Sequence, residues 1–185
     1  MYVARSRSPR SPRSDATRAR IVTAVRDLLG EGTFHESTVE QVAARAGVSR
    51  ATLYQHFGTR VGLVDAMCER FDANPALVAL RSVTDLEEFV ARVVDFWASE
   101  EKVLMQLYGA AAVDPAARAL VERQTRDRHR ELRRVLRSTG SDDGAAFASL
   151  AILTSFETFV ELRRRVRLPV RDVTRTLTEA ARGLV

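Results

Sequence analysis

The segment of residues 38–60 constrains the fold of this chain most, because two short helical patterns meet there across a single glycine. Thr38 has the side chain of a helix N-cap, and it precedes three apolar residues at helical spacing: Val42, Ala43 and Ala46. Gly47 then favours a left-handed turn, because it has no Cβ. Ser49 can cap a second helix, which carries two apolar residues four positions apart: Leu53 and Phe57.

This pattern predicts a helix-turn-helix, in which the second helix presents a polar face to the major groove of DNA. Arg50 can bind a guanine edge or a phosphate, and Gln55 can pair with adenine. Thr52 and Tyr54 suit phosphates or the methyl group of thymine. The candidate DNA-binding residues are Thr38, Ser49, Arg50, Ala51, Thr52, Tyr54, Gln55, His56 and Arg60.

The run G-V-S-x-x-T-L-Y-x-H-F at residues 47–57 resembles the signature of the TetR family of transcriptional regulators. The matching residues upstream are Ile21, Ala24, Leu28, Gly32-Thr33-Phe34, Thr38-Val39 and Val42-Ala43. The resemblance extends over about residues 17–71 and is only architectural beyond them. It implies a small DNA-binding domain followed by a larger helical domain that binds an effector and forms a dimer.

The resemblance also implies roles for single residues. It places Thr38, Tyr54 and His56 largely on phosphates, and it places a basic residue where this chain has Arg60. The valine and glycine that follow depart from the acidic residue and the alanine usual in the family. Because glycine in the first turn of a helix costs up to about 1 kcal/mol, we expect this helix to begin more loosely and to soften the link between the two domains.

Composition favours a globular helical protein of one or two domains that acts in the cytoplasm. Of the 185 residues, 45% are hydrophobic and 29% are charged, and glycine and proline lie between the periodic stretches. No run approaches the roughly 18 apolar residues of a membrane span, and the basic N-terminus lacks the apolar stretch of a secretion signal. The single cysteine, Cys68, excludes an internal disulfide and suits a buried helical position.

Positive charge is concentrated at the N-terminus. The formal net charge is +5, and all of the 29 basic residues except Lys102 are arginine. Residues 1–14 contain two prolines, no acidic residue and four arginines: Arg5, Arg7, Arg10 and Arg13. We expect a disordered basic arm there, which either follows the DNA or is a solvated tail; the sequence leaves both alternatives open.

We expect an all-α fold of about nine helices. The expected parts are the arm at residues 1–14, a helix-turn-helix domain at residues 15–74 and a helical effector-binding and dimerisation domain at residues 75–185. Within the first domain, residues 59–73 form a linking helix. The helices expected in the second domain start at about residue 86, residue 102, residue 115, residue 145 and residue 170.

The second domain has aromatic and apolar residues that suit a ligand pocket between helices. The candidate ligand-binding residues are Phe89, Trp97, Met105, Tyr108 and Phe156. Gln106, Thr154 and Glu157 are polar residues near them, so we expect a mostly apolar small molecule with one or two polar groups. The alternative is that the aromatic residues only fill the core. We interpret the arginine-rich run at residues 123–134 as a solvated face with ion pairs at helical spacing rather than as an anion site.

The resemblance implies that the last two helices of each subunit form a four-helix bundle in a homodimer. Apolar faces on these helices agree with that role, although they can also close the core of one subunit. The candidate interface residues are Ile152, Phe156, Phe159, Val173, Leu177, Ala180 and Leu184. Such a dimer needs two half-sites about one turn of DNA apart, or a multiple of it, and therefore a palindromic operator.

The sequence does not support an enzyme. The histidines His35, His56 and His129 are scattered, and the chain has neither a glycine-rich phosphate loop nor a nucleophile elbow. We therefore expect no catalytic residue, no metal and no cofactor. The predicted function is a ligand-responsive homodimeric repressor. The alternatives are a transcriptional activator, a non-specific nucleoid-type DNA-binding protein and a module that binds only other proteins.

Overall fold

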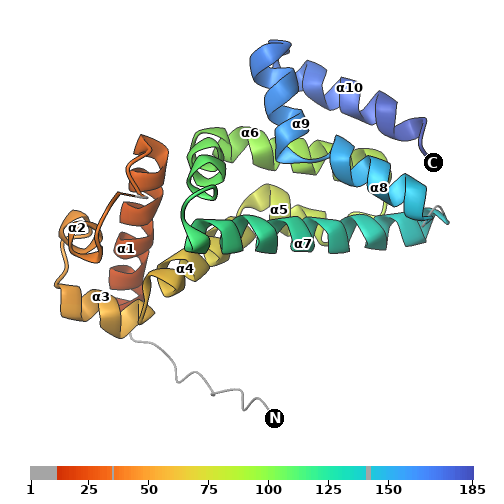
Figure 1. Cartoon of the computed structure of the whole chain (residues 1–185). Coiled ribbons are helices and arrows are strands. Elements are labelled where there is room, and N and C mark those ends of the chain that lie inside the picture. Colours follow the sequence, from red (N-terminus) through yellow and green to blue (C-terminus); the bar gives the residue numbers. More distant parts are fainter. Residues whose placement is uncertain (1–11, 35, 141–142) are drawn as a thin grey trace. The chain divides into compact units, whose positions relative to one another are not determined.

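The computed structural model describes residues 12–34, 36–140 and 143–185. Within these ranges the chain forms ten α-helices and one five-residue π-helical turn, without a strand (Figure 1). The expected all-α fold is thus confirmed, with ten α-helices where about nine were expected. The chain divides into two compact units, Met1–Met67 and Cys68–Val185, and the division falls inside α4 (Arg60–Asp72). The functional boundary expected at residue 75 stays a prediction.

The first unit consists of α1 (Pro12–Glu31), α2 (Val39–Arg45), α3 (Arg50–Phe57) and the start of α4. Its deeply buried side chains are Ile21, Val25, Leu29, Phe34, Val42, Leu53, Leu63 and Met67. The first helix begins at Pro12, where a proline is tolerated because the first helical N–H has no partner inside the helix. Residues 12–14 of the expected arm are therefore helical, and residues 1–11 lie outside the described part of the chain.

The second unit is built around α6 (Leu86–Ala110), which contacts α5, α7, α9 and α10. This helix is buried over much of its circumference, with its largest buried side chains Phe89, Phe96, Trp97, Leu104 and Leu107. Two separate helices were expected for residues 86–97 and residues 102–113. They form one continuous helix because no glycine or proline interrupts the residues between them.

Short polar side chains fix where the helices of the second unit begin. Asp85 accepts a hydrogen bond from the Glu88 backbone N–H at 2.9 Å and caps α6. In the same way Asp114 caps α7 (Pro115–Thr139), and Asp143 caps α8 (Gly144–Leu153). Each carboxylate satisfies backbone donors that have no partner within the helix.

The helix expected over residues 145–165 is broken after α8. It continues as α9 (Phe156–Val160) and a π-helical turn (Glu161–Arg165), before α10 (Val170–Arg182). At the break, the Thr154 hydroxyl donates to the Leu150 carbonyl at 2.7 Å, and Ser155 caps α9 by accepting from the Thr158 backbone N–H at 3.2 Å. Hydroxyl groups that bond to the local backbone compete with the helical hydrogen bonds, which explains why an apolar helix bends at these polar residues.

No single helix of the described ranges is long and apolar enough to cross a membrane. The bent pair Gly144–Leu153 and Phe156–Arg165, with an angle of 44° between its parts, passes the same test by length and composition. Core helices of globular proteins pass it too, and Leu150, Phe156 and Phe159 of this pair are buried inside the unit.

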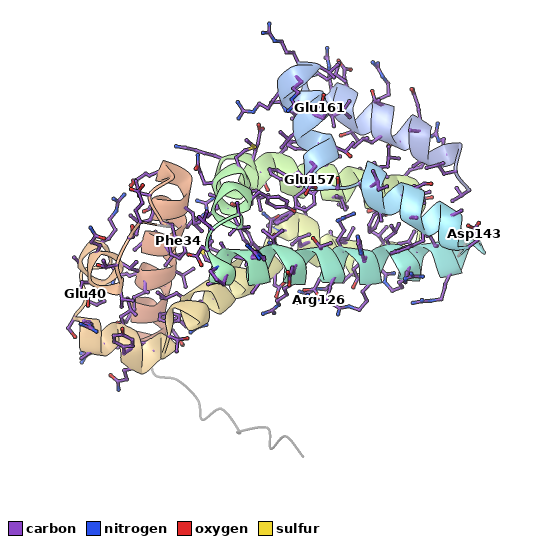
Figure 2. All side chains as sticks on the ribbon, viewed as in Figure 1. Phe34, Glu40, Arg126, Asp143, Glu157 and Glu161 are labelled. Atoms are coloured by element: carbon purple, nitrogen blue, oxygen red, sulfur yellow. The ribbon has the colours of Figure 1, made fainter. Side chains whose placement is uncertain are left out.

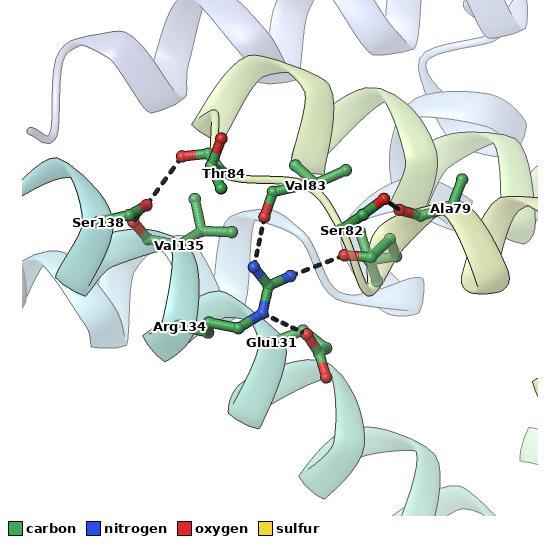
Figure 3. A network of polar contacts seen from close by, with 9 residues as sticks. Ala79, Ser82, Val83, Thr84, Glu131, Arg134, Val135 and Ser138 are labelled. Atoms are coloured by element: carbon green, nitrogen blue, oxygen red, sulfur yellow. Dashed lines mark hydrogen bonds and ion pairs between the residues drawn. The ribbon is translucent and has the colours of Figure 1, made fainter.

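Arg134 of α7 holds the end of α5 (Pro75–Leu80) and the turn that follows it (Figure 3). Its guanidinium donates to the Val83 carbonyl at 2.6 Å and to the Leu80 carbonyl at 2.8 Å, while its Nε–H donates to Glu131 at 2.8 Å. Ser138, one turn further along α7, donates to the Thr84 carbonyl at 2.9 Å. One arginine thus binds backbone carbonyls that the short helix leaves at its C-terminus.

We predict that Arg134→Met lowers the free energy of unfolding by about 2 kcal/mol, because it removes charge-assisted hydrogen bonds and leaves carbonyls of this turn without them. Urea denaturation followed by circular dichroism measures the change. The control is Arg126→Met, since Arg126 is exposed on the same helix and, among the described residues, pairs with Glu122 at 3.7 Å. An equal effect of both substitutions contradicts the anchoring role of Arg134.

Candidate functional site

The helix α3 has one buried and one exposed face. Leu53 and Phe57 are buried in the first unit, as their spacing predicts. On the other side Arg50, Ala51, Tyr54 and Gln55 are exposed, and Thr52 and His56 are half-buried. Ser49 caps the helix by accepting from the Thr52 backbone N–H at 3.0 Å, and the two hydroxyl oxygens lie 2.8 Å apart. The structure therefore brings most of the candidate DNA-binding residues together on one helix.

The turn before α3 has the geometry that the sequence predicts. Gly47 has a φ of +63°, a left-handed conformation that residues with a Cβ rarely adopt. Thr38 caps α2 through a capping box, in which it accepts from the Gln41 backbone N–H at 3.2 Å while its own N–H donates to the Gln41 side chain at 2.7 Å. Both helices of the motif thus begin at a residue predicted from the sequence.

Arg50 has a partner on the preceding helix that the sequence did not reveal. Its guanidinium lies 2.6 Å from the Glu40 carboxylate and 5.3 Å from the centroid of the Tyr54 ring. The hydrogen bond with Tyr54, and then the charge of Glu40, raise the pKa of Arg50. Glu40 lies in the first unit in Figure 2. The pair joins residues ten positions apart across the turn, where helical periodicity gives no signal.

Two candidate DNA-binding residues differ from the rest. The side chain of Arg60, at the first position of α4, lies outside the described part of the structure. His56 packs against Phe57, with the two ring centroids 6.1 Å apart. His56 is consequently less accessible than Tyr54, of which 38% is exposed.

The glycine that departs from the family pattern is required by the local backbone. A Cβ added to Gly62 would overlap the carbonyl oxygen of Phe57 and lie 2.9 Å from its carbonyl carbon. Both atoms belong to the backbone and cannot rotate away. The close approach of α4 to the end of α3 therefore excludes alanine at this position in the present arrangement.

We predict that Gly62→Ala destabilises the protein by about 1–3 kcal/mol, the usual range for overpacking. Gly109→Ala is the matched control, because Gly109 is also helical and a Cβ there would meet nothing within 4 Å. Since alanine is the better helix former, this control should gain up to about 1 kcal/mol. Thermal and urea unfolding of both variants measure the difference. A neutral or stabilising Gly62→Ala would show that the turn relaxes easily.

The candidate ligand-binding residues lie in different surroundings. Phe156 packs against Trp97 and Tyr108, with ring centroids 5.4 Å and 4.7 Å apart. Phe89 is fully buried elsewhere along α6, and 38% of Met105 is exposed. Burial, and after it the negative charge of Glu157, raise the pKa of Tyr108 to about 12. For Trp97, Tyr108 and Phe156 the alternative that aromatic residues fill the core thus has direct support.

A cavity of about 440 Å³ lies instead between the end of α4, α5, α6 and α7. Of the five candidate ligand-binding residues only Trp97 lines it. The lining residues are Asp72, Leu77, Leu80, Arg81, Val93, Phe96, Trp97, Arg123, Gln124, Asp127, Arg128, Arg130 and Glu131. Its volume falls within the usual range for small-molecule sites. The sequence pointed away from this cavity because we interpreted the arginine-rich run of α7 as a solvated face.

That interpretation holds for only part of α7. Arg126, Arg130 and Arg133 are exposed, and acidic residues at helical spacing pair with Arg126 and Arg130. Arg128 is partly buried, and burial lowers the pKa of its guanidinium. Within the described ranges both amide atoms of Gln124 are buried without a hydrogen-bond partner, an arrangement that costs about 1–3 kcal/mol.

The candidate interface residues fall into two groups. Phe156, Phe159, Val173 and Leu177 are buried inside the chain, where they close the core of one subunit. The exposed members are Ile152, Ala180 and Leu184. Ile152 stands out because 69% of this large apolar side chain is accessible on α8. For these four buried residues, the structure favours the alternative that the apolar faces close the core of one subunit.

The described residues contain no group of three or more His, Cys, Asp or Glu side chains that could hold a metal ion. His35 lies outside the described part, and His129 packs against Phe147 with ring centroids 5.4 Å apart. Burial, and then the charges of Arg128 and Arg133, lower the pKa of His129. This histidine is therefore a packed, neutral residue near neutral pH.

These features define a class: helix-turn-helix proteins with a separate, larger helical unit. The sequence model of "Bacterial regulatory proteins, tetR family" matches residues 21–67. The chain is 31% identical over 106 residues to the transcriptional regulator YdeS of Bacillus subtilis, covering 56% of this chain and 54% of YdeS. It is 32% identical over 92 residues to the transcriptional activator FasR of Mycolicibacterium smegmatis, covering 48% of this chain and 42% of FasR.

Solved structures extend the similarity of fold to most of the chain. A transcriptional regulator of Aquifex aeolicus VF5 superimposes with a TM-score of 0.68 at 17% identity, covering 91% of this chain and 99% of that one. A transcriptional regulator of Saccharomonospora viridis, solved in complex with choline, gives a TM-score of 0.64 at 18% identity, covering 89% of this chain and 95% of that one.

Residues 21–67 thus match the TetR family of bacterial transcriptional regulators, and the rest of the chain shares its fold with solved structures of transcriptional regulators. The relatives and the solved structures reported above are named as transcriptional regulators, which agrees with the expectation from the sequence. The chain spans about half the length of the curated relatives that it matches.

Proposed function

We propose that this protein is a sequence-specific transcriptional repressor that binds a palindromic operator as a homodimer. The observation that carries the proposal is the exposed face of α3, on which Arg50, Tyr54 and Gln55 lie together behind a left-handed turn. This face offers an arginine and an amide, the side chains that read guanine and adenine. A protein that binds chromosomal DNA acts in the cytoplasm.

The proposed dimer uses the exposed apolar residues of α8 and of the C-terminus. Ile152, Ala180 and Leu184 are accessible, whereas the other candidates are committed to the core of the subunit. A single recognition helix contacts few base pairs, so useful specificity needs two copies on an inverted repeat. Occlusion of promoter DNA by such a dimer favours repression.

A small molecule is proposed to release the repressor from DNA, and the cavity of the second unit is its proposed site. The complex of the Saccharomonospora viridis protein with choline supports this, because it shows that a protein of the same fold binds a small organic molecule. The basic arm at residues 1–14 is proposed to add non-specific contacts to phosphates.

Transcriptional activation is the second candidate function. The relative FasR carries the name of an activator. Activation and repression use the same DNA-binding face, so they differ in the position of the operator rather than in the residues described above. A transcription assay on the regulated promoter separates the two.

The proposal is tested by fluorescence anisotropy on inverted-repeat DNA from the region upstream of its own gene, with scrambled DNA as the comparison, over a salt series. We expect an affinity ratio of about a thousandfold or more that persists as salt rises. Equal and salt-sensitive affinities for both DNAs contradict specific binding at this operator. Repeating the measurement without residues 1–11 then shows whether the arm dominates, as a nucleoid-type protein requires.

Variants of α3 distinguish residues that contact phosphates from residues that recognise a base. We predict that Tyr54→Ala weakens binding to specific and to random DNA by a similar factor, because a phosphate contact carries no sequence information. Gln55→Ala should instead relax the preference at a single base pair, at a cost of about 1–3 kcal/mol on the specific DNA. Anisotropy with a set of single-base operator variants measures both effects. A uniform loss for Gln55→Ala would overturn its role in reading a base.

The dimer is tested at its most exposed apolar residue. We predict that Ile152→Glu shifts the protein toward a monomer and weakens operator binding, because a buried carboxylate without a partner opposes association. Sedimentation velocity over a range of concentrations measures the change. Val113→Glu is the matched control, since 72% of Val113 is exposed in the turn after α6. If both variants remain dimeric, the interface lies elsewhere.

A further inference from the structure

Arg128 carries a partly buried positive charge in the cavity wall, where the charge of Glu157 acts on it without a direct ion pair between the two residues. Its Nη1 donates to the Thr154 hydroxyl at 2.8 Å and to the Ala151 carbonyl at 2.9 Å, and its Nη2 lies 3.3 Å from Nε2 of His129. These partners are all neutral. Among the described residues no acidic oxygen comes within 4.0 Å of this guanidinium, so that Glu157 compensates its charge only from a longer distance, whereas charges removed from water are normally paired.

The remaining donors of Arg128 suit a carboxylate. A guanidinium has five N–H groups, of which Nη1 uses both and Nη2 directs one toward His129. In a guanidinium the Nε–H and one Nη2–H lie along one edge, in the fork arrangement that binds the two oxygens of a carboxylate, and no hydrogen bond of the Arg128 Nε–H to a described residue is found. An organic acid can therefore bind without displacing the existing hydrogen bonds.

The acidic residues of the cavity do not oppose such a ligand, because arginines neutralise them. Asp72 lies 3.7 Å from Arg123, and Asp127 pairs with Arg130. Glu131 binds Arg134 at 2.8 Å. After this pairing, the lining retains the charge of Arg128 inside and that of the exposed Arg81 at the edge. The cavity lining therefore has an excess of positive charge, at Arg128 and at Arg81.

Gln124 and the apolar wall of the cavity indicate which other groups the ligand carries. Gln124 precedes Arg128 by one helical turn on α7, so the two side chains share a face, and both line the cavity. Its amide has no hydrogen-bond partner among the residues that the structure describes, and it offers a donor and an acceptor side by side. The wall consists of apolar residues from α5 and α6: Leu77, Leu80, Val93, Phe96 and Trp97.

We propose that this cavity binds a small organic acid, whose carboxylate is held by Arg128, whose hydroxyl group is held by Gln124 and whose apolar body packs on α5 and α6. This inference deepens the proposed function, since it names the class of effector for a ligand-responsive regulator. It replaces the mostly apolar ligand expected from the sequence with an amphiphilic anion.

Two residues of the cavity wall, Trp97 and Arg128, form hydrogen bonds to the break between α8 and α9. These contacts connect the ligand site to the proposed dimer helices. Trp97 donates from Nε1 to the Thr154 carbonyl at 3.2 Å, and Arg128 donates to the Thr154 hydroxyl. Ile152 lies two residues before this break. A carboxylate on the outer edge of Arg128 therefore binds a side chain that already sets the position of the bend.

The test is isothermal titration calorimetry of the full chain with three matched probes and with inorganic phosphate. The probes are 3-(4-hydroxyphenyl)propionate, 3-phenylpropionate and 3-phenylpropionamide, which differ by the hydroxyl group and by the charge. We expect each acid to bind at least about tenfold more tightly than the amide, because the charge-assisted fork is lost in the amide. Phosphate should bind more weakly than either acid, because it has no apolar body.

Variants assign the effect to single residues. Arg128→Gln should abolish the preference for acid over amide, and Arg128→Lys should keep part of it, because lysine retains the charge without the fork. Gln124→Leu should remove the preference for the hydroxylated acid while the acid–amide difference remains. Arg126→Gln is the matched control on the exposed face of α7 and should change nothing. Circular dichroism establishes that each variant is folded.

Two results overturn the inference: equal affinity of the wild-type chain for acid and amide, or an acid preference that persists in Arg128→Gln. The first result needs no variant and so does not depend on the folding of one. Binding is measured without DNA, and therefore its failure is distinct from failure of the proposed function. Specific operator binding without an acid preference refutes only the ligand class. Acid binding through Arg128 that leaves operator affinity unchanged supports the site and refutes release by this ligand.

Discussion

Burial of α6 is the constraint on which the second unit depends. Its apolar residues run round most of the helix, and α5, α7, α9 and α10 each cover a part of it. A helix that is apolar nearly all round is stable only when other elements surround it. The surrounding helices meet α6 with different side chains, and where α7 carries arginine, aspartate and glutamine the packing leaves the cavity.

The helix-turn-helix was largely predictable because its signals are local. Thr38, Gly47 and Ser49 determine the ends of its helices through their own conformation and hydrogen bonds, and the spacing of Leu53 and Phe57 selects the buried face. The ion pair of Glu40 with Arg50 was not predictable in this way. It depends on how two helices are placed across the turn, which the spacing of residues along either helix does not encode.

In the second unit the sequence showed which residues share a face, but not which neighbour covers that face. Gln124 and Arg128 lie one turn apart on α7, and the same rule relates the exposed Arg126 to Glu122. The spacing is the same for Gln124 with Arg128 and for Glu122 with Arg126. Because the whole run is rich in charged residues, we expected both pairs to lie on a solvated face. Similarly, Val173 and Leu177 had the pattern of an interface and are buried within one subunit, because α10 packs on α6 and α8. The break at Thr154 was missed because hydroxyl groups are tolerated inside many helices.

The contact of Arg50 with Glu40 has a consequence for how the protein would search a chromosome. The carboxylate competes with DNA phosphates for the guanidinium, and both groups are exposed to solvent. If Arg50 reads DNA as proposed, an unmatched stretch offers it only a phosphate in exchange for Glu40, whereas a matched stretch adds the edge of a guanine. The dwell time on unmatched sequence is therefore shortened. On the proposed function, Glu40 thus helps the protein to leave unmatched sites quickly.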